Sequence, residues 1–143
     1  MDVELLGKAA EISLLREYPL FGMPIKAGFP SPAEDWVEGK IDFNQYLVKN
    51  PAATYLLKVK GDSMIDAGIS PEDIIVVDSS LEAKHKDIVI ACINGDMTLK
   101  RLYKRGKRLA LLPENPKYEA IEIAGDAEFS IWGVVKHVIK SMA

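Results

Sequence analysis

Short apolar runs separated by turn residues constrain the fold of this chain more than any other feature of its sequence. From Thr54 onward the runs are rich in Val, Ile and Leu, and they read TYLLKVK, DIIVVD, DIVIACI, MTLKRLY, RLALLP, IEI and FSIWGVVKHVI. Runs of this composition, bounded by turn residues, are typical of β-strands. Because the gaps between them leave little room for crossover helices, the sequence predicts a mainly β fold of curled antiparallel sheets, either a barrel or a sandwich.

The clearest turn lies in the stretch INGD, where Asn94 and Gly95 separate two of these runs. Asn-Gly is the favoured pair for a two-residue hairpin turn because both central positions need a positive φ. We therefore predict a hairpin whose strands cover residues 87–93 and 97–103. The stretches SPED (70–73) and PENPKY (113–118) predict further bends.

One short helix is expected in the stretch DFNQYLVKN. Asp42 is suited to cap its first turn. Phe43, Tyr46 and Leu47 follow at helical spacing and form one apolar stripe.

The first part of the chain differs in composition from the rest. Within residues 1–18 the apolar spacing fits a helix, but Gly7 weakens that interpretation, and an arm that changes conformation fits equally well. The proline-containing stretch from Pro19 to Pro32 then interrupts regular structure. We expect an N-terminal arm over residues 1–32 and a β-rich domain over residues 33–143.

Composition restricts the classes of protein to consider. A length of 143 residues with 48% hydrophobic content suits one soluble globular domain, and a net charge of −3 gives no overall reason to expect nucleic-acid or membrane binding. The single cysteine, Cys92, cannot form an internal disulfide. The longest aliphatic run, Ile74–Val77, is far too short to cross a bilayer, and the chain does not begin like a secretory signal. We expect a cytoplasmic protein.

The stretch MPIKAGFPSP places the small pair Ala27-Gly28 among three prolines. This segment can be neither a helix interior nor a central strand, so it should run extended. It is either a linker or a peptide bond that is meant to be cut.

Ser63 is a candidate nucleophile, because it directly follows a predicted strand and the turn residue Gly61. A serine hydroxyl needs a base nearby to accept its proton. The two histidines, His85 and His137, fit structural or solvated positions better. Lys100 is the other candidate base, although a strand lysine is ordinarily exposed. To act near neutral pH it must be dry, so this hypothesis predicts a buried lysine without a carboxylate partner.

The basic stretch KRLYKRGKR, residues 100–108, has two interpretations. It can neutralise phosphates, with Tyr103 available for stacking, or it can be a solvated edge that discourages strand aggregation. We favour the second and do not expect direct nucleic-acid binding. No HExxH, paired CxxC or glycine-rich phosphate loop occurs, so no metal or cofactor is predicted.

Several longer segments together resemble the LexA/UmuD family of self-cleaving Ser-Lys serine peptidases. They are GFPSPAEDW, IDFNQYL, ATYLLKVKGDSMIDAGISPEDIIVVD, KDIVIA, TLKRL and WGVVKHVI, from about Pro19 to nearly the C-terminus. A serine in GDSM followed 37 positions later (100 minus 63) by a lysine in TLK is the dyad signature of that family. The resemblance implies that Ser63 is the nucleophile, that Lys100 is the general base, and that Ala27-Gly28 is the scissile bond. UmuD proteins are best known with Cys-Gly there, whereas LexA-type repressors present Ala-Gly.

The resemblance also implies a biological role. Members with the LexA-like peptidase fold form homodimers and cleave slowly until a RecA filament on single-stranded DNA stimulates them in the SOS response. The shortened product then joins a UmuC-like Y-family polymerase in error-prone translesion synthesis. A LexA-type repressor would need a helix-turn-helix domain, which the roughly 26 residues before the cut are too few to form. The alternative is a non-catalytic β-rich binding module that regulates a polymerase or repressor, with Ser63 and Lys100 as relics.

Overall fold

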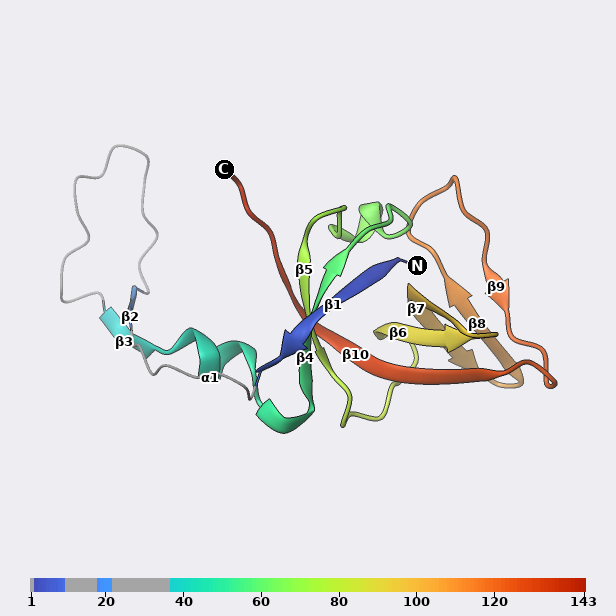
Figure 1. Ribbon diagram of the computed structural model, residues 1–143, viewed down its shortest axis with the longest axis horizontal. Helices are drawn as coiled ribbons and strands as arrows, with labels where there is room; N and C mark the ends of the chain where they lie inside the picture. The colour runs from blue at the N-terminus through green and yellow to red at the C-terminus, as the bar shows by residue number, and fades with distance from the viewer. Residues whose placement is uncertain (1, 10–17, 22–36) are drawn as a thin grey trace.

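The computed structural model describes residues 2–9, 18–21 and 37–143. Within them the chain is mainly β, with an eight-stranded antiparallel sheet in the order β1-β4-β5-β10-β6-β7-β8-β9 and a separate pair, β2-β3 (Figure 1). The strands are β1 (Val3–Lys8), β2 (Tyr18–Phe21), β3 (Val37–Ile41), β4 (Thr54–Val59), β5 (Ile74–Asp78), β6 (Ile88–Ile93), β7 (Asp96–Arg105), β8 (Arg108–Leu112), β9 (Ile121–Glu122) and β10 (Phe129–Ile139). The predicted class is confirmed, and each of the seven apolar runs contains a strand. The sheet ends at the edge strands β1 and β9 and does not close into a barrel.

The predicted hairpin is present between β6 and β7. Its strands pair from Ile88 with Arg101 to Ile93 with Asp96. Asn94 has a φ of 48° and Gly95 a φ of 86°, which are the positive values that this turn requires.

Strand β10 holds the two halves of the sheet together. Its first part pairs with β6 and its second part with β5, so it runs across the molecule from one half to the other (Figure 1). The register with β6 shifts between Ile131 and Gly133. At that point β10 approaches β5 so closely that a Cβ atom on Gly133 would lie 2.5 Å from Val77 Cγ1. A glycine is therefore needed where the strand passes between its partners.

The buried side chains form two clusters, one on each side of this crossing. One cluster joins β1, β4, β5, β6 and β7, and the other joins β6, β7, β8 and β10. The members of the first cluster are Val3, Leu57, Val59, Met64, Ile69, Ile75, Val77, Ile90 and Leu99. The members of the second are Val89, Ala91, Leu102, Leu111 and Val134. The first cluster packs beneath the loop that carries Ser63.

The predicted helix is confirmed as α1 (Phe43–Leu47), capped by the Asp42 carboxylate, which accepts a hydrogen bond from Asn44 N at 2.9 Å. Its aromatic residues do not enter the core, because Phe43 and Tyr46 remain about half exposed. In the part of the chain that the structure describes, no helix has the length and apolar character needed to span a membrane.

The structure bears on one open alternative about the first residues of the chain. Residues 3–8 are not helical, since they form strand β1, which pairs with β4 from Val3 opposite Val59 to Lys8 opposite Tyr55. Residues 18–21 of the expected arm form strand β2, whereas residues 10–17 and 22–36, with the boundary near residue 32 and the Ala27-Gly28 bond, lie outside the described residues.

Candidate active site

Ser63 lies in the loop that follows β4, just before the short 3₁₀ helix Ile65–Ala67. The serine is 5% exposed. Its loop is braced by the segment after β8, where Glu114 N donates to the Ser63 carbonyl oxygen at 2.8 Å and Asn115 Nδ2 donates to the Asp62 carbonyl oxygen at 2.9 Å. These bonds fix the backbone of the loop at Asp62 and Ser63, and the next residue, Met64, belongs to the first core cluster.

Lys100 approaches Ser63 from β7. It is also 5% exposed, and its Nζ lies 3.0 Å from Ser63 Oγ. The amine further contacts Thr98 Oγ1 at 2.7 Å and the Leu99 carbonyl oxygen at 3.2 Å. Strand β4 belongs to one half of the sheet and β7 to the other, so the curl of the sheet around β10 brings these two side chains together (Figure 1).

A serine hydroxyl within hydrogen-bonding distance of a buried amine can perform nucleophilic chemistry. If the amine is neutral, its lone pair can accept the hydroxyl proton as the oxygen attacks a carbonyl carbon. If the amine is charged, it only donates hydrogen bonds, and the serine stays a weak nucleophile. The protonation state of Lys100 therefore decides whether the pair is active.

The expectation that this lysine has no carboxylate partner is wrong. Lys100 Nζ lies 3.0 Å from Asp2 Oδ2, which also accepts hydrogen bonds from Thr98 Oγ1 at 2.6 Å and from Leu99 N at 3.3 Å. The pairing of β1 with β4 carries Asp2 to the site. Burial alone would raise the pKa of Asp2, but the hydrogen bonds from Thr98 and Lys100 and the charge of Lys100 together hold it below its usual value of 3.8.

A groove of about 400 Å³ begins at Asp2 and follows the start of β7. Residues of the β6-β7 hairpin line it together with Ile121 of β9; they are Ile93, Asn94, Asp96, Met97 and Thr98. Ser63 and Lys100 do not line this groove, but Asp2 and Thr98, which both contact Lys100, do.

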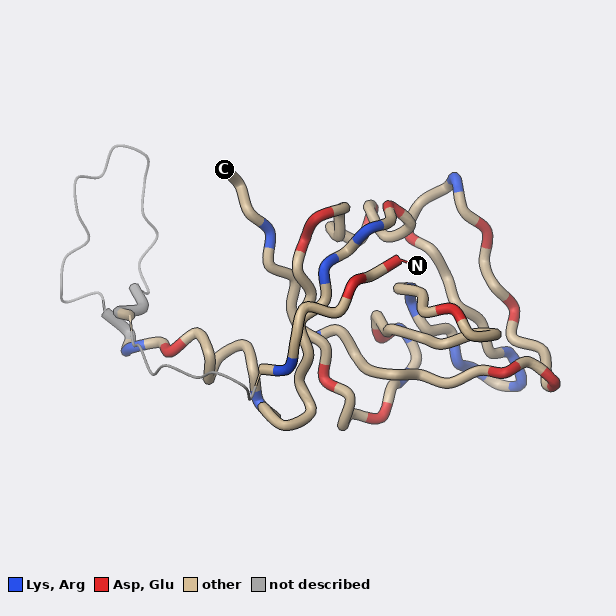
Figure 2. Tube along the Cα trace, viewed as in Figure 1, with Lys and Arg blue, Asp and Glu red and all other residues tan. Residues whose placement is uncertain are grey.

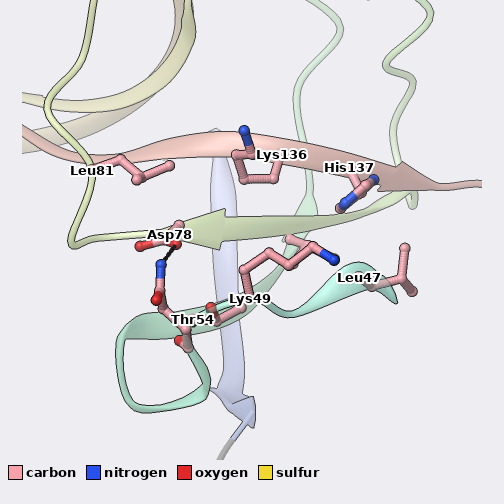
Figure 3. Close-up of a pocket in the computed structure, with 9 residues that line it drawn as sticks. Leu47, Lys49, Thr54, Asp78, Leu81, Lys136 and His137 are labelled. Carbon is pink, nitrogen blue, oxygen red and sulfur yellow. Dashed lines mark hydrogen bonds between the residues drawn. The ribbon is translucent and has the colours of Figure 1, made fainter. Parts of the chain in front are cut away.

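The two histidines lie elsewhere. His85 Nδ1 accepts a hydrogen bond from Lys104 N at 3.0 Å, and its pKa is lowered by desolvation and by the charges of Arg105 and Lys86. His137 lines a smaller pocket of about 120 Å³ between α1, β5 and β10 (Figure 3). Neither histidine has a hydrogen bond to Ser63 among the described residues, so neither is placed to be its base.

The pocket in Figure 3 is built around a buried carboxylate and not around a nucleophile. Asp78 accepts hydrogen bonds from Asn50 Nδ2 at 2.7 Å, Ser80 N at 2.8 Å and Ser80 Oγ at 2.6 Å. Its polar atoms already have partners within the protein. The role of this network is to tie the loop before β4 to the end of β5.

No metal site is apparent in the described ranges 2–9, 18–21 and 37–143, where no three His, Cys, Asp or Glu side chains gather around a common point. Cys92 is a free, half-buried thiol on β6.

Sequence reasoning missed two residues of the site. Thr98 could have been predicted, because residues two apart on a strand face the same side, and Thr98 therefore shares a face with Lys100. Asp2 carried no such signal, since it is 98 positions from Lys100 and belongs to a segment whose structure the sequence left open.

Comparison with known proteins identifies the family of the chain. Residues 19–136 match the family described as Peptidase S24-like. The chain is 43% identical to protein MucA of Salmonella typhimurium over 126 residues, which cover 87% of this chain and 86% of MucA. It is 44% identical to protein ImpA of Shigella flexneri over 123 residues, or 85% of this chain and 82% of ImpA. It is also 42% identical to the LexA repressor of Bordetella avium over 125 residues, which cover 87% of this chain and 58% of that repressor. The chain therefore belongs to the Peptidase S24-like family of serine peptidases.

Proposed function

We propose that the protein is a serine endopeptidase that cleaves its own chain between Ala27 and Gly28. Ser63 is the nucleophile and Lys100 is the general base. The observation that carries this proposal is the distance of 3.0 Å between Lys100 Nζ and Ser63 Oγ. Both residues are only 5% exposed.

The reaction requires the neutral form of Lys100. Its amine accepts the Ser63 proton while Oγ attacks the carbonyl carbon of Ala27, which gives a tetrahedral intermediate. We expect backbone N–H groups at or beside Ser63 to stabilise the oxyanion. Lys100 then returns the proton to the nitrogen of Gly28, and the C–N bond breaks. Water hydrolyses the remaining ester, so the products are a leader that ends at Ala27 and a body that begins at Gly28.

The sequence around the bond suits this reaction. Gly28 has no side chain to collide with the nucleophile, and the nearby prolines reduce the conformations that must be lost when the segment docks. An extended segment can enter the site by adding to a sheet edge. Because nucleophile and bond belong to one chain, proximity replaces tight recognition of a free peptide, and each molecule reacts once.

The resemblance to UmuD supports a role in SOS mutagenesis. In this role a RecA filament on single-stranded DNA favours the docked conformation of the cleavage segment, which is a shift of population and adds no catalytic group. The shortened protein, as a homodimer, then serves as the accessory subunit of a UmuC-like Y-family polymerase during error-prone translesion synthesis in the cytoplasm. The similarity to MucA and ImpA over more than four-fifths of the chain supports the same assignment.

Self-cleavage is tested by incubating the purified protein at alkaline pH, where more of the lysine is neutral, and measuring intact mass. We expect a fragment that begins at Gly28 and that is absent in Ser63→Ala and in Lys100→Ala. Lys104→Ala is the matched control, because it removes an exposed lysine from the same strand and should leave cleavage unchanged. Equal cutting in all variants would indicate a contaminating protease. No cutting in any of them, even with RecA filaments present, would favour the non-catalytic binding module.

A further inference from the structure

Asp2 and strand β1 occupy the approach to the Ser63 and Lys100 side chains. The Asp2 carboxylate contacts Lys100 and Thr98, and its backbone oxygen accepts a hydrogen bond from Lys60 N at 2.7 Å. The next residue, Val3, is only 2% exposed and belongs to the first core cluster. Backbone pairing, apolar burial and an ion pair therefore hold the same short segment at the site.

We propose that Asp2 and β1 are a built-in ligand of the catalytic cleft, which competes with the cleavage segment for the same place. The inference rests on the self-cleavage proposed above and names what regulates it. The Asp2 carboxylate contacts Lys100 while the strand that follows it pairs with β4, so the first residues of this chain already place an extended segment at the site.

The carboxylate acts on the base directly. An ammonium group paired with a carboxylate in a mostly buried site is stabilised in its charged form, and a charged Lys100 has no lone pair for the Ser63 proton. Thr98 bridges the two groups, since its oxygen contacts both Asp2 Oδ2 and Lys100 Nζ. The other titratable groups beside the contact are Tyr118, which feels the charge of Asp2, and Asp62, which accepts the Tyr118 hydroxyl hydrogen bond.

The strand also blocks the route of the substrate. β4 pairs with β5 on one side and with β1 on the other, so β1 takes the edge that an added peptide strand would need. Just before the start of β1, the Asp2 side chain accepts hydrogen bonds from Thr98 and Leu99 on β7. A Cβ atom on Gly61 would lie 3.1 Å from Asp2 Oδ1, so the carboxylate fills the space that the glycine leaves open beside Ser63.

Asp2→Asn tests the proposal in the full-length protein, because it removes the charge and keeps the shape of the side chain. We expect self-cleavage at neutral pH to be faster by about tenfold, the size of effect typical of one hydrogen bond to a charged group. Glu4→Gln is the matched control: it removes one acidic charge from the same strand, but Glu4 contacts the exposed Lys60 at 3.3 Å and not the site. Its rate should equal that of the unmodified protein.

A second measurement does not depend on cleavage. In the Ser63→Ala background, Asp2→Asn should increase amide hydrogen exchange in residues 3–8 and 55–60, whereas Glu4→Gln should not. Ser63-dependent cutting that Asp2→Asn leaves unchanged or slows would overturn the built-in ligand while self-cleavage stands. Increased exchange without Ser63-dependent cutting in any variant would reject both proposals and leave β1 a structural strand.

Discussion

The bend of β10 at Gly133 offers a quantitative test of how the two halves of the sheet are joined. Replacing Gly133 by alanine places a methyl group 2.5 Å from Val77 Cγ1 and 3.2 Å from the backbone oxygen of Asp78. Carbon atoms in ordinary contact are about 3.5–4 Å apart, so the methyl group must displace its neighbour by about 1 Å. Val77 is fully buried and branched at Cβ, so its side chain cannot turn away into solvent.

The cost of this displacement follows from known core substitutions. An added methyl group in a packed core typically costs about 1–3 kcal/mol. We expect about 2–3 kcal/mol for Gly133→Ala, because its second neighbour is backbone and yields less than a side chain. In a chain of this size the loss corresponds to a melting temperature lower by roughly 6–10 °C. The same shift should move β7 relative to β4 and slow self-cleavage.

The free energy of unfolding is measured by urea unfolding followed by circular dichroism. The measurement uses the Ser63→Ala background, so that self-cleavage does not interfere. Gly125→Ala is the control, since nothing lies within 4 Å of its added methyl group, and it should change the free energy of unfolding by less than about 0.5 kcal/mol. Val77→Ala removes the atom in conflict, so the double variant should be more stable than the sum of the single changes by about 1–2 kcal/mol. Strict additivity, or a Gly133→Ala protein as stable as its parent, would refute the explanation.

Three further predictions concern other parts of the molecule. Asp78→Ala should lower the free energy of unfolding at neutral pH by about 1–3 kcal/mol, because it leaves buried donors without an acceptor. Burial alone would raise the pKa of Asp78, but hydrogen bonds from its neighbours hold it below 3.8, so its contribution to stability is present above that pH and is lost as the pH falls further. Urea midpoints measured from pH 7 to pH 2 should therefore fall less steeply below pH 3.8 in Asp78→Ala. Asn115→Ala removes the brace on the Asp62 carbonyl and should slow self-cleavage several-fold with a stability change of less than about 1 kcal/mol, whereas the exposed neighbour Lys117→Ala should leave the rate unchanged. The basic stretch 100–108 should show no salt-dependent DNA binding in fluorescence anisotropy at low salt; measurable affinity that falls with added salt would contradict the view that it is a solvated edge.

That last expectation has a structural basis in the described residues. The guanidinium of Arg101 lies 2.6 Å from Glu114, and that of Arg108 lies 2.7 Å from Glu122 and stacks on the Tyr103 ring. The lysine that begins the stretch, Lys100, is buried at the site. Two of the six basic residues of the stretch are therefore paired with acids and one is buried, so the charge available to phosphates is smaller than the sequence suggests. The exposed basic residues gather at the turn between β7 and β8 (Figure 2).

The strands of the β-rich domain could be predicted because local features of the sequence determine them. The Asn94-Gly95 turn fixes the β6-β7 hairpin through backbone conformation alone. The branched apolar runs specify strands wherever turn residues delimit them. Ser63 and Lys100 were candidates by residue type and by resemblance, yet their meeting depends on the curl of the whole sheet around β10.

The strand β1 was not predictable in the same way. Its sequence, VELLGK, mixes residues that favour helices with a glycine that weakens both helix and strand. It becomes a strand because β4 offers an edge and the core offers a place for Val3, and both are tertiary causes. The carboxylate at the site depends on that pairing, which is why no local sequence pattern predicts it.

The position of β1 along the chain matters for what remains after a cut at Ala27-Gly28. In the intact protein this strand re-pairs with β4 whenever it separates, at the high effective concentration that a covalent tether provides. Hydrolysis converts the pairing into an encounter between two molecules, and dilution then favours departure of the leader. The body would keep β4 as an unpaired edge, which is a surface to which another chain can add a strand. One irreversible event would thus end the reaction and expose a docking edge for the next partner.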